Sequence, residues 1–353
     1  HHPLWLFRLL LGAAIGVDAL GGFLVMRALD VPEQERWPLG IALAFLLILL
    51  TAAVAKSVII TVAAAQLTIS STASLSINGT ISPIHGLDNY GTLDNSGTIR
   101  VGNTSAIGAI GIVQRNGGTL NNKIGGLIQI DRTGSGEALY TSGTVNNEGS
   151  IEIGGNATVV GKGLTIEVTT GIFNNKTGGL LTINRSTQWG MENKGILDNS
   201  GTIRVGNIAS VGAICIVHRN GGTFANKPGG AIYMDRTTAG GQAFYSSGLV
   251  NNQGSIKIGS NADLNGEGIR IDGNTFNNEA LIEIGSQADV KGIGIRNGSG
   301  CTFNNKVGGE IRINRIGVPN TNVIGAIRNE GTFTNDAKIT VGNIGLVRAQ
   351  DGI

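Results

Sequence analysis

One unit of about 27 residues recurs along most of this 353-residue chain and constrains the fold more than any other feature. The segment TLNNKIGGLIQIDR at Thr119–Arg132 returns as IFNNKTGGLLTINR at Ile172–Arg185, TFANKPGGAIYMDR at Thr223–Arg236 and TFNNKVGGEIRINR at Thr302–Arg315. A shorter relative, LDNSGTIRVGN, occurs unchanged at Leu93–Asn103 and Leu197–Asn207, so four units form a larger duplicated block. A fixed period of this size indicates a solenoid, in which each unit buries its apolar face against its neighbours.

Within each unit the apolar residues alternate with a period of two, as in β-strands. Every unit has an apolar–variable–apolar triplet after a glycine-containing corner, and Ile128 and Ile130 around Gln129 are an example. A further apolar stretch precedes the next unit, as at Ile110–Val113, Ile214–Val217, Ile269–Ile271 and Ile293–Ile295. Three short strands and three glycine-rich corners, with 57 glycines in the chain, predict one coil of a parallel β-helix per unit.

We therefore predict an all-β, right-handed parallel β-helix of about ten coils over residues 66–353, with an additional entry segment at Gln66–Tyr90. The six-residue repeat of left-handed β-helices and the leucine frame of leucine-rich repeats do not occur here. Parallel crossover connections are nearly always right-handed, which favours the right-handed coil.

An asparagine stands two residues after the apolar residue that opens each of the ten units. By parity this column faces inward, and stacked asparagines can pass amide hydrogen bonds from coil to coil. We predict a structural asparagine ladder made of Asn95, Asn122, Asn147, Asn175, Asn199, Asn226, Asn252, Asn278, Asn305 and Asn335.

Residues 1–65 differ sharply in composition and form a hydrophobic segment that we expect to be α-helical. Pro38–Ala55 has no charge over eighteen residues, about the minimum for a membrane span, whereas Asp18 weakens a first span at Leu9–Met26. The segment is interpreted as a membrane hairpin with Arg27 and Arg36 in a cytoplasmic loop, as a secretory signal ending before Gln66, or as a foreign segment. The first two interpretations place the repeats across a membrane.

The NNxGxIxIG units resemble the β-strand repeats of secreted bacterial right-handed β-helix proteins, such as adhesins and autotransporter-like passengers. The resemblance covers about Gln66–Ile353. It implies a cell-surface or extracellular location and an adhesive or structural role. It does not identify a ligand. A net charge of +2 gives no reason to expect nucleic acid as a partner.

Charged residues occupy several of the outward positions of the repeat. Corner lysines and strand-end arginines of the longer units form a candidate contact stripe for an acidic glycan: Lys123, Arg132, Lys176, Arg185, Lys227, Arg236, Lys306 and Arg315. Protection of the corners against aggregation explains the lysines at least as well. Lys257, Glu283 and Arg312 are expected to form a charge ladder on consecutive coils. His218 replaces Gln114 of the earlier block and is interpreted as a surface variation, and Cys215 and Cys301 lie too far apart in the coil frame for a disulfide.

No cluster of catalytic carboxylates, no metal motif and no cofactor motif is visible in the sequence, so we predict no enzyme activity and no cofactor. The leading hypothesis is a non-enzymatic cell-surface or extracellular structural or adhesive solenoid, associated with a membrane through residues 1–65. The alternatives are a polysaccharide-active or polysaccharide-binding β-helix protein and a subunit of an end-to-end filament. The last coil has no polar cap, so we expect either further repeats beyond Ile353 or self-association through this open end.

Overall fold

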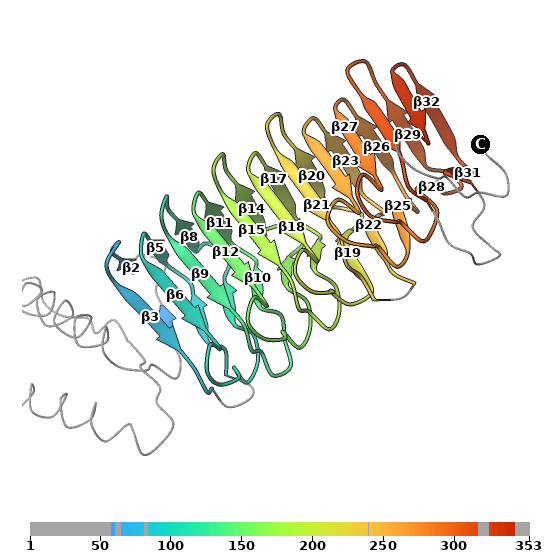
Figure 1. The fold of residues 1–353 in the computed structure, drawn as a ribbon. Helices are drawn as coiled ribbons and strands as arrows, with labels where there is room; N and C mark the ends of the chain where they lie inside the picture. The colour runs from blue at the N-terminus through green and yellow to red at the C-terminus, as the bar shows by residue number, and fades with distance from the viewer. Residues whose placement is uncertain (1–57, 61–64, 81–83, 239, 317–324, 343–353) are drawn as a thin grey trace, which may run out of the picture.

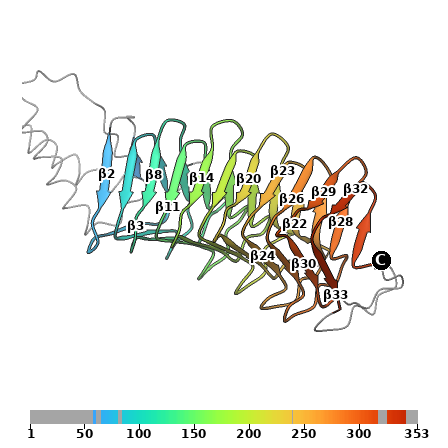
Figure 2. The same cartoon turned by 90° about the horizontal axis from the view of Figure 1, so that it is seen from above.

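The repeats fold into a long parallel β-solenoid. The computed structural model describes residues 58–60, 65–80, 84–238, 240–316 and 325–342, which form three parallel sheets of 11 strands each. Figures 1 and 2 show the coils stacked along one axis, with the strands of each sheet side by side. The predicted all-β parallel solenoid of about ten coils with asparagine ladders is confirmed, and its coils are about 26 residues apart in sequence. With neighbouring strands about 4.8 Å apart, the described stack is about 50 Å long.

Each coil contributes one strand to each sheet, in the order sheet 1, sheet 2, sheet 3. Sheet 1 consists of β1 (Val58–Ile60), β4 (Leu87–Asn89), β7 (Ile112–Gln114), β10 (Leu139–Thr141), β13 (Leu164–Ile166), β16 (Met191–Asn193), β19 (Ile214–His218), β22 (Gln242–Ser246), β25 (Glu267–Ile271), β28 (Ile295–Asn297) and β31 (Ile327–Asn329). Sheet 2 consists of β2 (Gln66–Ile69), β5 (Thr92–Asn95), β8 (Thr119–Asn122), β11 (Thr144–Asn147), β14 (Ile172–Asn175), β17 (Ile196–Asn199), β20 (Thr223–Asn226), β23 (Leu249–Asn252), β26 (Thr275–Asn278), β29 (Thr302–Asn305) and β32 (Thr332–Asn335). Sheet 3 consists of β3 (Ser74–Ile77), β6 (Thr98–Val101), β9 (Leu127–Ile130), β12 (Ser150–Ile153), β15 (Leu180–Ile183), β18 (Thr202–Val205), β21 (Ala231–Met234), β24 (Ser255–Ile258), β27 (Leu281–Ile284), β30 (Glu310–Ile313) and β33 (Lys338–Val341).

The predicted apolar triplets are the strands of sheet 3, and their two apolar residues point into the core. In β9, Ile128 and Ile130 are buried while Gln129 between them is partly exposed. The strand register is the same from coil to coil, since Ile128 pairs with Ile151 of β12 and with Ile99 of β6. The hydrophobic effect thus fixes the register, because a slip of one residue would turn this buried pair toward water.

The strands of sheet 1 correspond to the third apolar stretches of the sequence, with shifted boundaries. The stretch at Ile110–Val113 becomes β7, which begins at Ile112, directly after Gly111. A Cβ atom on Gly111 would lie 2.6 Å from the carbonyl oxygen of Ala138 on the next coil. The close approach of neighbouring backbones accounts for a glycine at this position.

Phenylalanine rings fill the core between sheets 1 and 2 in the C-terminal half. Phe276 and Phe303 of sheet 2 stack at 5.0 Å between ring centroids with an interplanar angle of 4°. In the coil that has the smaller Val250 in sheet 2, Phe244 of sheet 1 supplies the ring. Phe244 contacts Phe224 at 5.0 Å and Phe276 at 5.9 Å, edge to face, and so continues the aromatic column across the Val250 coil.

The corners that follow sheet 3 are of two kinds. One kind has a glycine with positive φ, as at Gly102 (φ 69) and Gly206 (φ 72). The other has an Asx–Arg pair at Asp131–Arg132, Asn184–Arg185, Asp235–Arg236 and Asn314–Arg315. A side chain at Gly102 would lie 2.4 Å from the carbonyl oxygen of Arg132, so glycine is required beside the Asx–Arg corner of the next coil.

The solenoid reaches into the segment that was predicted to be hydrophobic and helical, since β1 pairs in parallel with β4. The predicted membrane segments at Leu9–Met26 and Pro38–Ala55 lie outside the described residues. Within the described residues, no helix has the length and hydropathy that a membrane span requires.

Candidate functional site on the outer faces of the solenoid

The predicted asparagine ladder is confirmed. Each side-chain amide donates a hydrogen bond to the amide oxygen of the asparagine on the next coil, at 2.7–2.8 Å, from Asn95 through to Asn335. The ladder starts at Asn95 because the same column holds Ile69 on the coil before it, and the Asn95 Oδ1 has no donor among the described residues. These ten asparagines belong to the scaffold.

A second row of amides runs along the outside of sheet 2 and was missed in the sequence. Asn146 donates to Asn121 at 2.9 Å, and Asn174 donates to Asn146 at the same distance. Asp198 and Ala225 interrupt the row, which resumes where Asn277 donates to Asn251. The repeated Asn-Asn pair was visible, but only its second residue was assigned a role.

The four lysines of the predicted contact stripe are engaged with acids of the preceding coil. Lys123 pairs with Asp94 at 3.0 Å, Lys176 with Glu148 at 2.7 Å, Lys227 with Asp198 at 2.7 Å and Lys306 with Glu279 at 3.0 Å. Hydrogen bonds from the Asn121 amide and from Lys123 hold the pKa of Asp94 below its ordinary value. These lysines therefore compensate charge at the corners that join sheets 2 and 3.

The four arginines of the stripe bind backbone carbonyls of the preceding corner. Arg132 donates to Gly102 and Asn103, Arg185 to Gly154 and Gly155, Arg236 to Gly206 and Asn207, and Arg315 to Gln287. Their Asx partners point the opposite way, and Asp131 accepts the backbone N–H of Asn156 on the next coil at 2.9 Å. The corners with Asp131, Asn184 and Asp235 thus bind the glycine corners on both sides, whereas Asn314 donates to Glu283 and does not contact a following corner among the described residues.

The expected charge ladder on sheet 3 forms in part. Lys257 lies 3.6 Å from Glu283, whereas Arg312 pairs at 2.7 Å with Glu310 on its own strand. Ion pairs with Arg312 and Lys338 lower the pKa of Glu310 to about 2. Pairing within a strand competes with pairing between coils because residues i and i+2 lie on the same face.

His218 does not lie on the surface, and the interpretation as a surface variation is wrong. Its side chain is fully buried in sheet 1, where Nδ1 accepts a hydrogen bond from the Asn193 side-chain amide at 3.2 Å and Nε2 donates to the Leu249 carbonyl at 3.0 Å. Burial lowers the pKa of His218 to about 4, so the ring is neutral at pH 7. The matching position in the earlier block, Gln114, is buried as well, because this column of sheet 1 faces inward.

Both cysteines are free thiols and are buried, as expected from their separation in the coil frame. Burial raises the pKa of Cys215 well above its ordinary value, and that of Cys301 as well. A protonated, inaccessible thiol is a poor nucleophile, so these residues act as core side chains.

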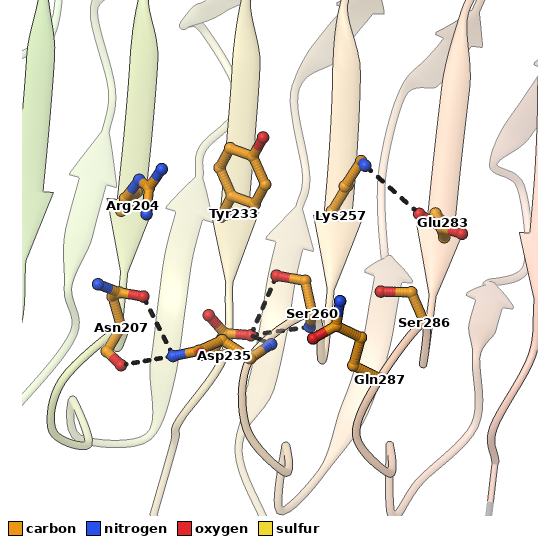
Figure 3. A pocket seen from close by; sticks show the side chains of 10 residues that line it. Arg204, Asn207, Tyr233, Asp235, Lys257, Ser260, Glu283, Ser286 and Gln287 are labelled. Carbon is orange, nitrogen blue, oxygen red and sulfur yellow. Dashed lines mark hydrogen bonds and ion pairs between the residues drawn. The ribbon is translucent and has the colours of Figure 1, made fainter.

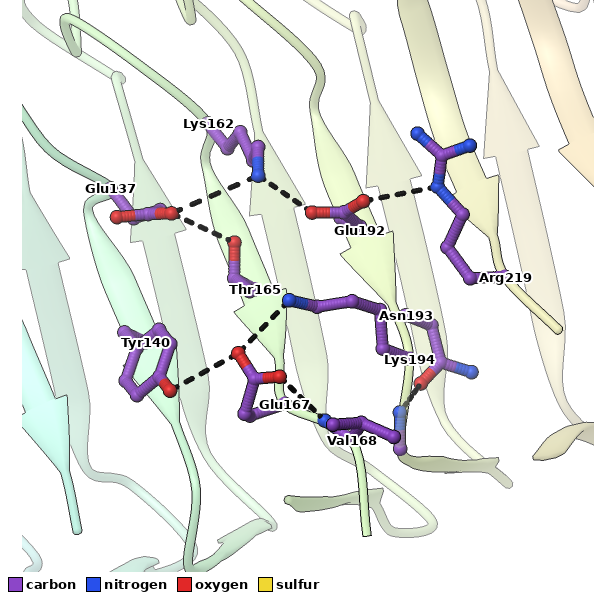
Figure 4. Close-up of polar contacts among 11 residues, drawn as sticks. Glu137, Tyr140, Lys162, Thr165, Glu167, Val168, Glu192, Asn193, Lys194 and Arg219 are labelled. Atoms are coloured by element: carbon purple, nitrogen blue, oxygen red, sulfur yellow. Dashed lines mark hydrogen bonds and ion pairs between the residues drawn. The ribbon is translucent and has the colours of Figure 1, made fainter. Parts of the chain in front are cut away.

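An interlocked cluster of charged and aromatic residues covers the outer face of sheet 1 around β13 and β16 (Figure 4). Lys162 lies 2.6 Å from Glu192 and 3.9 Å from Glu137, and Arg219 binds the other oxygen of Glu192 at 3.1 Å. The ring of Trp189 lies against Lys162 and Arg219, at 5.0 Å and 4.9 Å. The cations of this cluster are already shared among carboxylates and rings.

A shallow groove of about 440 Å³ lies on the outer face of sheet 3, over β18 to β27. Arg204, Tyr233, Lys257 and Glu283 form one side, and the corners at Asn207, Asp235, Ser260 and Gln287 form the other (Figure 3). Asp235 is buried and accepts the backbone N–H groups of Ser260 and Asn261 at 2.8 and 2.9 Å. Burial raises the pKa of Asp235, although these hydrogen bonds oppose the rise.

The sequence predicted neither the groove nor the cluster on sheet 1. The alternation of residues indicates which side chains of sheet 3 point outward, but it does not indicate which cations have a protein partner. Among the described residues, no group of three or more His, Cys, Asp or Glu side chains is arranged to hold a metal ion. Comparisons with known protein families, curated proteins and solved structures found no match to this chain.

Proposed function

We propose that this protein is an exported, non-enzymatic rod that acts at the cell surface or outside the cell in a structural or adhesive role. The proposal includes a right-handed coil, which the chirality of parallel crossovers favours, and membrane association through residues 1–65. The observation that carries it is the unbroken stacking of three 11-stranded sheets around one asparagine ladder. Such a stack is an elongated rod that presents a regular outer face along its axis.

The hydrogen bonds and pKa shifts of the carboxylates favour a role without catalysis. Glycoside-cleaving enzymes need a carboxyl group with a raised pKa as general acid, close to the substrate. Glu167 instead accepts hydrogen bonds from Lys194 at 2.9 Å and from Tyr140 at 3.1 Å, and its pKa is lowered. Asp235 has a raised pKa, but its oxygens are bonded to the backbone of the next corner.

Two measurements test the proposal. Protease treatment of intact source cells should release fragments of the repeats, because a surface rod is accessible to the protease. Incubation with a panel of polysaccharides should give binding or no interaction, without new reducing ends or unsaturated products. Turnover of any polysaccharide, or complete protection of the repeats in intact cells, contradicts the proposed function.

A further inference from the structure

The groove on sheet 3 arises from a break in the alternation of corners. Asx–Arg corners follow β9, β15 and β21, on every second coil, but the next one follows β30 and not β27. β24 and β27 are both followed by glycine corners, at Gly259 and Gly285. Ser286 stands where the alternation would place an arginine, and the groove extends over the corners from Asn207 to Gln287, including this one (Figure 3).

Arg204 beside this groove differs from the stripe cations. It is exposed, and its guanidinium lies 5.0 Å from the centroid of the Tyr233 ring. Within the described part of the chain Arg204 forms no ion pair, whereas the four stripe lysines are paired with acids and the four stripe arginines bind carbonyls. An exposed guanidinium without an acidic partner is suited to bind a carboxylate with two parallel hydrogen bonds.

The duplicated block provides an internal comparison for Arg204. Arg100 occupies the same place in the identical segment LDNSGTIRVGN, but its neighbour on the next coil is Gln129, and Arg100 Nε donates to Gln129 Oε1 at 3.1 Å. In the second copy the neighbour is Tyr233, which has no amide to accept this bond. The exchange of Gln129 for Tyr233 therefore replaces the amide acceptor by an aromatic ring.

We propose that this groove binds an acidic polysaccharide, with a uronate carboxylate on Arg204 and a sugar ring against Tyr233. This rests on the proposed function as a non-catalytic contact surface and identifies the chemical class of its ligand. Aromatic side chains pack against the apolar faces of sugars. The donors of Ser260 and Asn261 bond Asp235 and Asn207, so these residues offer their oxygens as acceptors for sugar hydroxyls, and Gln287 lines the groove beside them. The strand spacing of about 4.8 Å is comparable to one sugar residue of an extended chain, so the ligand can run along the solenoid axis.

The test is a binding titration of the full chain with short polyuronate oligomers and with neutral cello-oligomers as the matched probe. The wild-type protein should bind polyuronate more tightly than the neutral oligomer, and added salt should weaken only the polyuronate complex. R204Q should weaken polyuronate binding by about tenfold or more, since a charge-assisted hydrogen-bonded pair is lost. R100Q, the same change in the other copy of the segment, should leave the affinity within about twofold of wild type.

Y233Q introduces glutamine, the residue type that the first block has at Gln129, and should also weaken polyuronate binding about tenfold. Circular dichroism of each variant checks that the solenoid is intact, which is expected because both side chains point outward. The assignment is overturned if wild type prefers the neutral oligomer, if R204Q and R100Q lose affinity equally, or if an intact rod binds no polyuronate. Cleavage of the oligomer would instead contradict the proposed function. The comparison of R204Q with R100Q would still show whether the ligand binds in this groove.

Discussion

At the scale of single residues, the inward columns of the solenoid combine apolar side chains with amides that are hydrogen-bonded to their neighbours. A buried amide is tolerated only when its donors and acceptors find partners. Asn199 in the middle of the ladder accepts from Asn175 and donates to Asn226, both at 2.8 Å. The ladder thus fixes the stacking of coils, while the apolar columns supply most of the driving force.

We predict that N199A lowers the free energy of unfolding by about 2–4 kcal/mol, because it leaves a small cavity and a buried Asn226 oxygen without its donor. Urea unfolding followed by circular dichroism measures this change. The control is N335A at the exposed end of the described ladder, which should cost less than about 1 kcal/mol. Equal effects of the two substitutions would show that ladder position does not matter.

His218 predicts a pH dependence of stability. Its pKa is about 4 in the folded protein and 6.5 as the ordinary value, so the unfolded chain binds the proton more readily. Stability should therefore be complete above pH 6.5, fall as the pH is lowered toward 4, and lose roughly 3 kcal/mol from this residue over that window.

The matched variant is H218Q, which introduces the residue type found at Gln114 and keeps both a donor and an acceptor. Thermal unfolding midpoints of the two proteins, measured between pH 4 and 7, should converge near neutrality and separate in acid. The titration of the carboxylates is common to both proteins and cancels in the difference. Parallel curves for the two proteins would contradict the burial of a neutral histidine.

At the scale of strands, each coil of the C-terminal half places one phenylalanine at the junction of sheets 1 and 2. The coils of β20, β26 and β29 have Phe224, Phe276 and Phe303 in sheet 2. The coil of β22 and β23 instead combines Phe244 with Val250. The volumes are therefore complementary within a coil, as expected of a close-packed interior.

We predict that V250F and F244I each destabilise the protein by about 1–3 kcal/mol, the first by overpacking and the second by leaving a cavity. The double variant should recover much of this loss, because it recreates the arrangement of the neighbouring coils. A double-mutant cycle from denaturant unfolding measures the coupling energy. Additivity within about 0.5 kcal/mol would contradict packing of the two side chains in one shared space.

At the scale of the whole molecule, the solenoid is a one-dimensional stack in which each coil contacts its neighbours. The two copies of LDNSGTIRVGN are 104 residues apart, so β17 can take the place of β5 if four coils are removed. The variant lacking residues 93–196 joins Thr92 to Leu197 and keeps every column in register. We expect it to fold into a rod shorter by about 19 Å, as measured by small-angle X-ray scattering.

The control deletes one residue more, residues 93–197, and shifts the following strand by one position. This shift points Asp198 inward and exposes the residues that belong in the core, so the variant should be poorly folded or aggregated. If both deletions gave equally folded rods, the alternation of inward and outward residues would not determine the register. Soluble expression and circular dichroism distinguish the two results.

The sequence alone determined the parallel solenoid and the asparagine ladder, because both depend on a local pattern that recurs once per coil. Ile128, Ile130 and Asn122 could be placed inside by parity, without knowing which residues lie opposite them. The tertiary structure decided everything that depends on contacts between coils: the pairing of Lys123 with Asp94, the burial of His218, and the groove beside Arg204. The physical reason is that neighbours in this fold are about 26 residues apart in the chain, so a charge or ring gains its role from the adjacent coil.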